Sequence, residues 1–198
     1  MPEPIASASL RAALFRERPD DHLYDDPIPA PTEYDPHYAA YIDPVAREDV
    51  MRQLEAQAKS TSALLATIPE SRAGFRYAPG KWSIRDVIGH IADSERIFAY
   101  RALRIARHDK TPLASFDEND YAAVAGFDGR TLADVGAELA SVRSGTITLF
   151  RSMNAETLAL TGTASGKPIS VRALAFIILG HERHHLNVIK AKYLSEAK

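Results

Sequence analysis

Apolar side chains recur at intervals of three and four positions in four stretches of the chain, which is the spacing of amphipathic helices. These stretches are residues 44–68, 83–107, 131–153 and 170–189. No convincing pair of β-strands and no internal repeat can be recognised. The pattern therefore predicts an all-α protein with four main helices.

Polar residues that can cap a helix N-terminus stand at the start of each stretch. They are Asp43 (followed by Pro44), Ser83, Thr131 and Ser170. In the second helix, Asp86 follows Ser83 at the spacing of a capping box, and the third helix repeats this spacing. These caps support the predicted helix starts.

The connection between the second and third helices spans residues 108–130 and is interrupted by Pro112 and Gly126. So long a connection is uncommon in a compact domain unless it is functional or crosses the bundle. A crossover makes helices two and three parallel, and the fourth antiparallel to both. We therefore expect a four-helix bundle with a long crossover between its second and third helices.

Residues 1–43 are rich in proline, which interrupts long helices. They are expected to form an irregular N-terminal arm, with a short helix near residues 7–16, ahead of a bundle domain over residues 44–198. A disordered tail is the alternative. Aromatic rings at this frequency favour packing on a surface. The arm contains Tyr24, Tyr34, Tyr38 and Tyr41.

The composition limits the classes of function. A formal net charge of -2 gives no support for nucleic-acid binding, which depends on neutralising phosphates. The chain has no cysteine, so disulfides, thiolate ligands and a cysteine nucleophile are excluded. Neither a signal peptide nor a membrane-spanning run is recognised, and we expect a cytoplasmic protein.

Three histidines carry the candidate chemistry. His181 and His185 lie four positions apart, on the same helix face as Leu174 and Ile178. His90 faces inward from the second helix, at nearly the same level if helices two and four are antiparallel. Three imidazoles on facing helices are typical of an open metal site of catalytic type. Hydrogen-bonded core histidines are the alternative for the first pair.

Two roles are open to each of the polar residues beside these histidines. Glu182 can hold a ligand in place or accept a proton, but its position on the helix slightly favours solvent. Asp93, one turn after His90, either orients that imidazole or is an exposed charge. His184 is a reserve ligand in case His185 points away. The remaining histidines are expected at the surface: His22, His37 and His108.

The crossover contains a polar stretch, FDENDY, at residues 116–121. If it folds over the metal end of the bundle, Asp117, Asp120 and Tyr121 can contact a substrate. The alternative is a short helix that begins at Asp117 and has a solvated acidic face.

The string HERHH at residues 181–185 also matches HExxH, the signature of zinc proteases. Thermolysin-like enzymes take a third ligand, a glutamate, some way beyond this motif, and only thirteen residues follow His185. Metzincins require glycine and histidine where this chain has Val188 and Ala191. A metallopeptidase is therefore disfavoured.

Residues 76–96 (RYAPGKWSIRDVIGHIADSER) and 180–186 (GHERHHL), with the stretch at 116–121, resemble the DinB-like family of bacterial proteins. The likeness covers most of residues 46–195. It implies an up-down-down-up four-helix bundle, commonly a homodimer, with zinc or nickel bound by three histidines. At the matching positions these are His90, His181 and His185. Some relatives act with low-molecular-weight thiols such as bacillithiol or mycothiol.

Together these features predict metal-dependent chemistry on a small molecule, such as S-transfer, isomerisation or hydrolysis. A metal ion lowers the pKa of a bound water or thiol. Since the chain lacks cysteine, any thiol must be a cosubstrate. The competing class is a non-enzymatic metal-binding or stress-response bundle with a structural or ligand-sequestering site.

Overall fold

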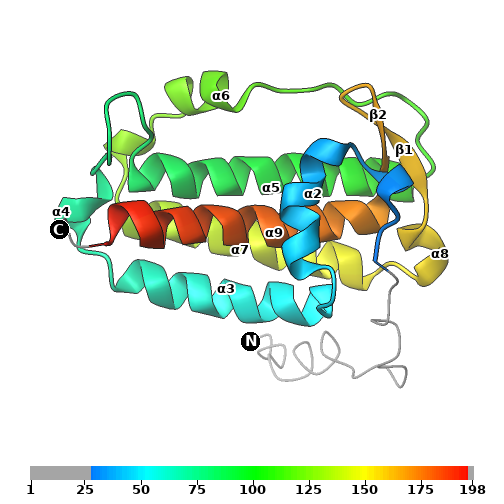
Figure 1. The fold of residues 1–198 in the computed structure, drawn as a ribbon, viewed down its shortest axis with the longest axis horizontal. Coiled ribbons are helices and arrows are strands. Elements are labelled where there is room, and N and C mark those ends of the chain that lie inside the picture. Colours follow the sequence, from blue (N-terminus) through cyan, green and yellow to red (C-terminus); the bar gives the residue numbers. More distant parts are fainter. Residues whose placement is uncertain (1–27, 196–198) are drawn as a thin grey trace, which may run out of the picture.

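Four long helices form a bundle in the computed structural model, which describes residues 28–195 (Figure 1). They are α3 (Val50–Ala66), α5 (Ile84–Ala106), α7 (Leu132–Arg151) and α9 (Val171–Val188). Shorter helices are α4 (Glu70–Ala73), α8 (Ala155–Leu158) and a π-helical turn, η6 (Ile189–Tyr193). The predicted four-helix bundle is confirmed. Within residues 28–195, no helix is long and apolar enough to cross a membrane.

Contacts at the helix ends fix the helix directions. Tyr193, beyond the end of α9, donates a hydrogen bond of 2.8 Å to the carbonyl of Trp82, before the start of α5, so these helices are antiparallel. Glu70 accepts from Arg85 at the start of α5 and from the backbone of Leu132 at the start of α7, so these helices are parallel. In Figure 1, α3 runs in the direction of α9, which gives the expected up-down-down-up order.

The crossover between α5 and α7 contains α6 (Glu118–Val124) and the short turn η5 (Phe127–Gly129). Its first part lies alongside a β-hairpin formed by residues 161–170. There the backbone N–H of Leu113 donates a hydrogen bond of 2.9 Å to the carbonyl of Thr163. Its second part places α6 against the N-terminal half of α5 (Figure 1). The crossover therefore covers the half of α5 that carries His90.

The hairpin was not predicted. It consists of β1 (Thr161–Ala164) and β2 (Lys167–Ser170), paired antiparallel. The turn has positive φ at both central residues, 53° at Ser165 and 75° at Gly166, as a tight two-residue hairpin requires. Four-residue strands contain too few apolar positions to produce a readable alternation, although Ala164 and Ile169 join the core.

Three predicted caps are confirmed. The side chains of Ser83, Thr131 and Ser170 each accept a hydrogen bond from the backbone of the third following residue. The backbone N–H of Ser83 also donates the reciprocal hydrogen bond to the Asp86 carboxylate, which completes a capping box. The first helix start is a correction. Asp43 opens the 3₁₀ turn η4 (Asp43–Val45), and α3 begins at Val50 with Asp49 as its cap.

Residues 31–45 form an N-terminal strap that crosses α9 (Figure 1). It contains η2 (Pro31–Glu33), η3 (Pro36–Tyr38), α2 (Ala39–Ile42) and η4. Tyr34, Ile42 and Val45 are buried in the core. Glycine is required at position 180, because a Cβ there would lie 1.9 Å from the carbonyl oxygen of Tyr41. The short helix expected near residues 7–16 lies outside the described residues.

Candidate metal centre

His90 on α5 and His181 and His185 on α9 point their imidazoles toward one another. The Nε2 atom of His181 lies 3.0 Å from Nε2 of His90 and 3.1 Å from Nε2 of His185. One ring nitrogen from each residue lies within 4.8 Å of the other two. The antiparallel packing of α5 and α9 thus brings together three histidines that are up to 95 positions apart in the sequence.

The geometry of these nitrogens fits a shared cation. A neutral imidazole nitrogen either donates one proton or accepts with one lone pair. His181 Nε2 therefore cannot make two full hydrogen bonds to the two neighbouring rings. If each imidazole nitrogen directs its lone pair at one shared metal ion, all three nitrogens are satisfied. Tetrahedral coordination with Zn–N bonds of ~2.05 Å separates its ligand atoms by about 3.3 Å, close to the observed 3.0 and 3.1 Å.

Burial keeps the three imidazoles uncharged at neutral pH. It lowers the pKa of His90 to about 4, opposed by the negative charge of Glu118. Burial and the neighbouring histidines His90 and His184 lower the pKa of His185 to about 3. The pKa of His181 is also well below its ordinary value, again mainly because of burial. Neutral imidazole is the form that binds metal ions, so the site is preorganised for a divalent cation.

Aromatic rings surround the histidines. The ring centroid of Trp82 lies 4.7 Å from that of His90, and those of Tyr41 and Phe98 lie 5.3 and 5.8 Å from that of His181. Tyr41 comes from the strap, outside the stretch that resembles the DinB-like family. Sequence reasoning did not place it at the site, because helical periodicity carries no information on how an irregular segment packs.

The expectation that Glu182 faces solvent is wrong, since only 1% of its surface is exposed. Its carboxylate accepts hydrogen bonds from Thr61 at 2.5 Å and Gln57 at 2.7 Å, and pairs with Arg143 at 2.6 Å. Arg143 also forms a two-pronged pair with Glu95, both contacts being 2.8 Å. These hydrogen bonds and this ion pair therefore join Glu182 to α3 and α7 rather than to the histidines.

These residues form a buried ionic cluster, composed of Thr61, Glu95, Arg143 and Glu182, with one member on each long helix. On α7 the buried residue is Arg143 and not the neighbouring Val142, which is only partly buried. The spacing of four from Leu139 was a readable signal, since it puts Arg143 on the same face. Because buried charges are rare, this spacing alone did not identify Arg143 as a core residue.

The other polar candidates near the histidines do not contact the three imidazole nitrogens that converge. Asp93 is half-buried and pairs with Arg96 at 3.1 Å, and burial raises its pKa. The group facing Nδ1 of His90 is instead the hydroxyl of Ser94, at 3.4 Å. His184 is exposed, and His185 occupies the inward position for which His184 was the reserve. His37 and His108 are exposed, as expected, whereas His22 lies outside the described residues.

The crossover stretch adopts the capped-helix alternative. Asp117 is the N-cap of α6, where its carboxylate accepts from the backbone of Asn119 at 2.8 Å. Asp120 and Tyr121 are exposed, and the Tyr121 ring packs against Phe116. The member of this stretch whose charge acts on His90 is Glu118, which sequence reasoning did not single out.

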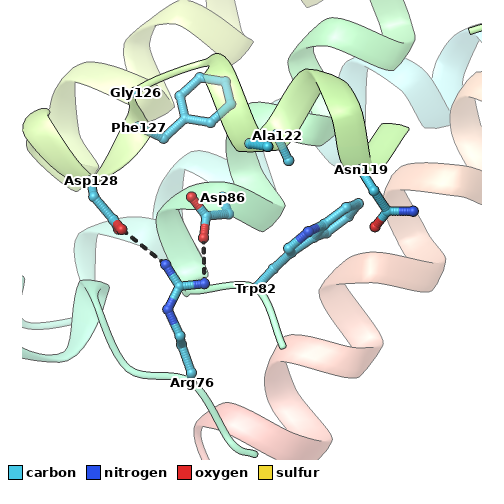
Figure 2. A pocket seen from close by; sticks show the side chains of 9 residues that line it. Arg76, Trp82, Asp86, Asn119, Ala122, Gly126, Phe127 and Asp128 are labelled. Carbon is cyan, nitrogen blue, oxygen red and sulfur yellow. Dashed lines mark hydrogen bonds and ion pairs between the residues drawn. The ribbon is translucent and has the colours of Figure 1, made fainter. Parts of the chain in front are cut away.

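Beside the centre is a cavity of about 260 Å³ between the N-terminal end of α5, α6 and η5 (Figure 2). Its lining includes Arg76, Trp82, Asp86, Asn119, Phe127 and Asp128. Trp82 contacts both the cavity and the ring of His90, so this side chain is a wall shared by the two sites.

Comparisons with known proteins agree with the fold. YfiT from Bacillus subtilis, described as a probable metal-dependent hydrolase with an unusual four-helix bundle topology, has a similar fold with a TM-score of 0.63. The two chains are 16% identical over 82% of this chain and 89% of YfiT. No curated protein sequence matches significantly. The DinB superfamily profile matches residues 53–189, a stretch that holds all three histidines and most of the bundle, and the chain belongs to that superfamily.

Proposed function

We propose that this protein is a metal-dependent enzyme that acts on a small molecule, with zinc or nickel bound by His90, His181 and His185. The convergence of three neutral imidazole nitrogens carries the proposal. Imidazole ligands suit zinc and nickel among other divalent metals. The description of YfiT as a probable metal-dependent hydrolase supports the same class of activity.

The bound ion would lower the pKa of a water molecule or a cosubstrate thiol and so supply the nucleophile for hydrolysis or S-transfer. The protein's own residues position and shield this chemistry. Trp82, Tyr41 and Phe98 surround the imidazoles with aromatic rings and limit access of bulk water. The buried ionic cluster fixes α9 against the other three helices, and therefore fixes the positions of His181 and His185.

Metal analysis of variants tests the ligand set. The purified protein should contain about one divalent ion per chain, and His90→Ala or His185→Ala should each remove most of it. His184→Ala is the matched control, because this neighbouring histidine is exposed and should not affect metal content. Full metal content in His90→Ala or His185→Ala would refute this ligand set.

A cobalt-substituted sample tests the reaction class. If an external thiol is the cosubstrate, then glutathione, mycothiol or bacillithiol should change the visible spectrum of the bound cobalt ion. An unchanged spectrum would exclude an external thiol as cosubstrate. Hydrolysis of a small ester or amide would then be the activity to assay. Failure of every substrate with a fully loaded site would instead favour a ligand-sequestering protein.

A further inference from the structure

The cavity beside the metal centre differs from the centre in its chemistry. Figure 2 shows the Trp82 ring below α6, with Asn119 on one side and the group formed by Arg76, Asp86 and Asp128 on the other. Its volume of about 260 Å³ is slightly below the ~300–1,000 Å³ of typical ligand pockets. The cavity is therefore large enough for one end of a small substrate.

The charges around the cavity favour a cation. Arg76 is paired with Asp86 at 2.8 Å and with Asp128 at 2.9 Å, so its charge is already neutralised. One guanidinium against two carboxylates leaves an excess of one negative charge in the lining. The carboxylate of Asp128 is 61% exposed, and its other oxygen accepts only a long hydrogen bond of 3.3 Å from the Ser83 hydroxyl, so this side chain is open to an incoming group.

The aromatic wall favours the same type of ligand. Tryptophan has the strongest affinity of the aromatic side chains for a cation placed against its ring face. The Trp82 backbone is held in position by the hydrogen bond from Tyr193. An ammonium group in the cavity would thus meet an aromatic ring and an excess of carboxylate charge, the two features that recognise such groups in proteins.

We propose that this cavity binds the positively charged end of the substrate, an ammonium group in contact with the Trp82 ring, while the other end of the substrate reaches the metal centre. The inference rests on the proposed function. The indole, which contacts His90 as well as lining the cavity, separates the substrate's cationic end from the metal ion. The favoured substrates are therefore small amines or quaternary ammonium compounds with an electron-rich group at the opposite end.

Trp82 is the sole tryptophan of the chain, so its fluorescence reports directly on this wall. The experiment titrates metal-loaded protein with choline and, separately, with its uncharged isostere 3,3-dimethylbutan-1-ol at constant ionic strength. Choline should bind about 2- to 30-fold more tightly, the range that a cation–π contact supplies. Equal binding of the two probes, tighter binding of the alcohol, or no saturable change with choline would overturn the inference.

Two variants that each remove one carboxylate charge test whether the preference for choline comes from the cavity. Asp128→Asn removes the exposed carboxylate of the cavity and should weaken choline binding while leaving the alcohol unaffected. Asp134→Asn removes an exposed carboxylate that pairs with Arg130 outside the cavity, and should leave both affinities unchanged. Equal losses in the two variants would mean that choline responds only to net charge, which also contradicts the inference.

The metal content of the same samples separates this inference from the proposed function. A loaded centre without preferential choline binding would refute the cavity assignment alone. Preferential choline binding by a chain that takes up no divalent metal would refute the proposed enzyme and, with it, the cavity's role in substrate binding.

Discussion

The buried polar groups of the metal centre and of the buried ionic cluster are accommodated in different ways. The imidazoles of the metal centre are neutral because burial disfavours the charged form. In the buried ionic cluster, Arg143 instead pairs with both Glu95 and Glu182, and a hydrogen bond from Thr61 satisfies a further oxygen of Glu182. Glu182 therefore belongs to the scaffold, and its place next to His181 in the sequence does not make it the general base of a protease.

The metal-free protein should lose stability as the pH falls from 7. His90 and His185 have pKa values of about 4 and about 3 in the folded chain, against ~6.5 for an unfolded histidine. Between these values the unfolded state binds protons that the folded state does not, so stability rises with pH across this window. Urea unfolding between about pH 5 and pH 7 avoids most carboxylate titration. In His185→Ala the free energy of unfolding should depend less steeply on pH. An unchanged slope would contradict the assigned burial of this imidazole.

Replacing Arg143 by methionine should strongly destabilise the protein. The change leaves two buried carboxylates without their cation, which typically costs about 3–5 kcal/mol. Arg151→Met is the control on the same helix, because its ion pair with Glu55 is solvent-exposed and such pairs contribute about 0–1 kcal/mol. Urea unfolding measures both. Equal midpoints for the two variants would refute the structural role of the cluster.

At the scale of elements, two segments outside the four long helices complete the surroundings of the metal centre. The strap brings Tyr41 against the rings of His181 and His184. The crossover brings α6, with Glu118 and Asn119, to the side of α5 that carries His90. Both segments contain short helical turns broken by proline or glycine, so their lengths and amphipathic patterns gave little indication of where they pack.

Gly180→Ala tests the fit of the strap on α9. The new methyl group would lie 1.9 Å from the carbonyl oxygen of Tyr41, so the strap must move, at a cost of about 1–3 kcal/mol for overpacking. Gly145→Ala is the control, because nothing lies within 4 Å of a Cβ at that exposed position of α7. We expect faster proteolysis within residues 31–45 in the first variant only. Equal resistance in both would show that the strap is not held at this point.

At the scale of the whole molecule, the parallel arrangement of α5 and α7 determines the site. It requires the long crossover, and it leaves α9 antiparallel to α5 with His181 level with His90. A simple up-and-down bundle with short loops would have no crossover to bring α6 against the half of α5 that carries His90. The directions of the helices thus bring the three histidines together and place the cavity beside them.

We propose that the protein is a homodimer, as its resemblance to the DinB-like family implies. Tyr100 and Leu103 lie about one turn apart on α5 and expose 52% and 37% of their surfaces, which offers an apolar contact. Light scattering should give about twice the chain mass of 21.7 kDa. Leu103→Asp should shift the protein toward the monomer. A monomeric wild-type protein at micromolar concentration would contradict the proposal.

The sequence by itself determined the four main helices, because periodic apolar positions and the capping residues Ser83, Thr131 and Ser170 are local signals. It also indicated the three histidines, since two lie on one helical face and the third at a matching level. Only the tertiary structure decided what surrounds them. The burial of Glu182 with Arg143, the approach of Tyr41 and the cavity beside Trp82 depend on contacts between residues far apart in the sequence, for which local periodicity provides no information.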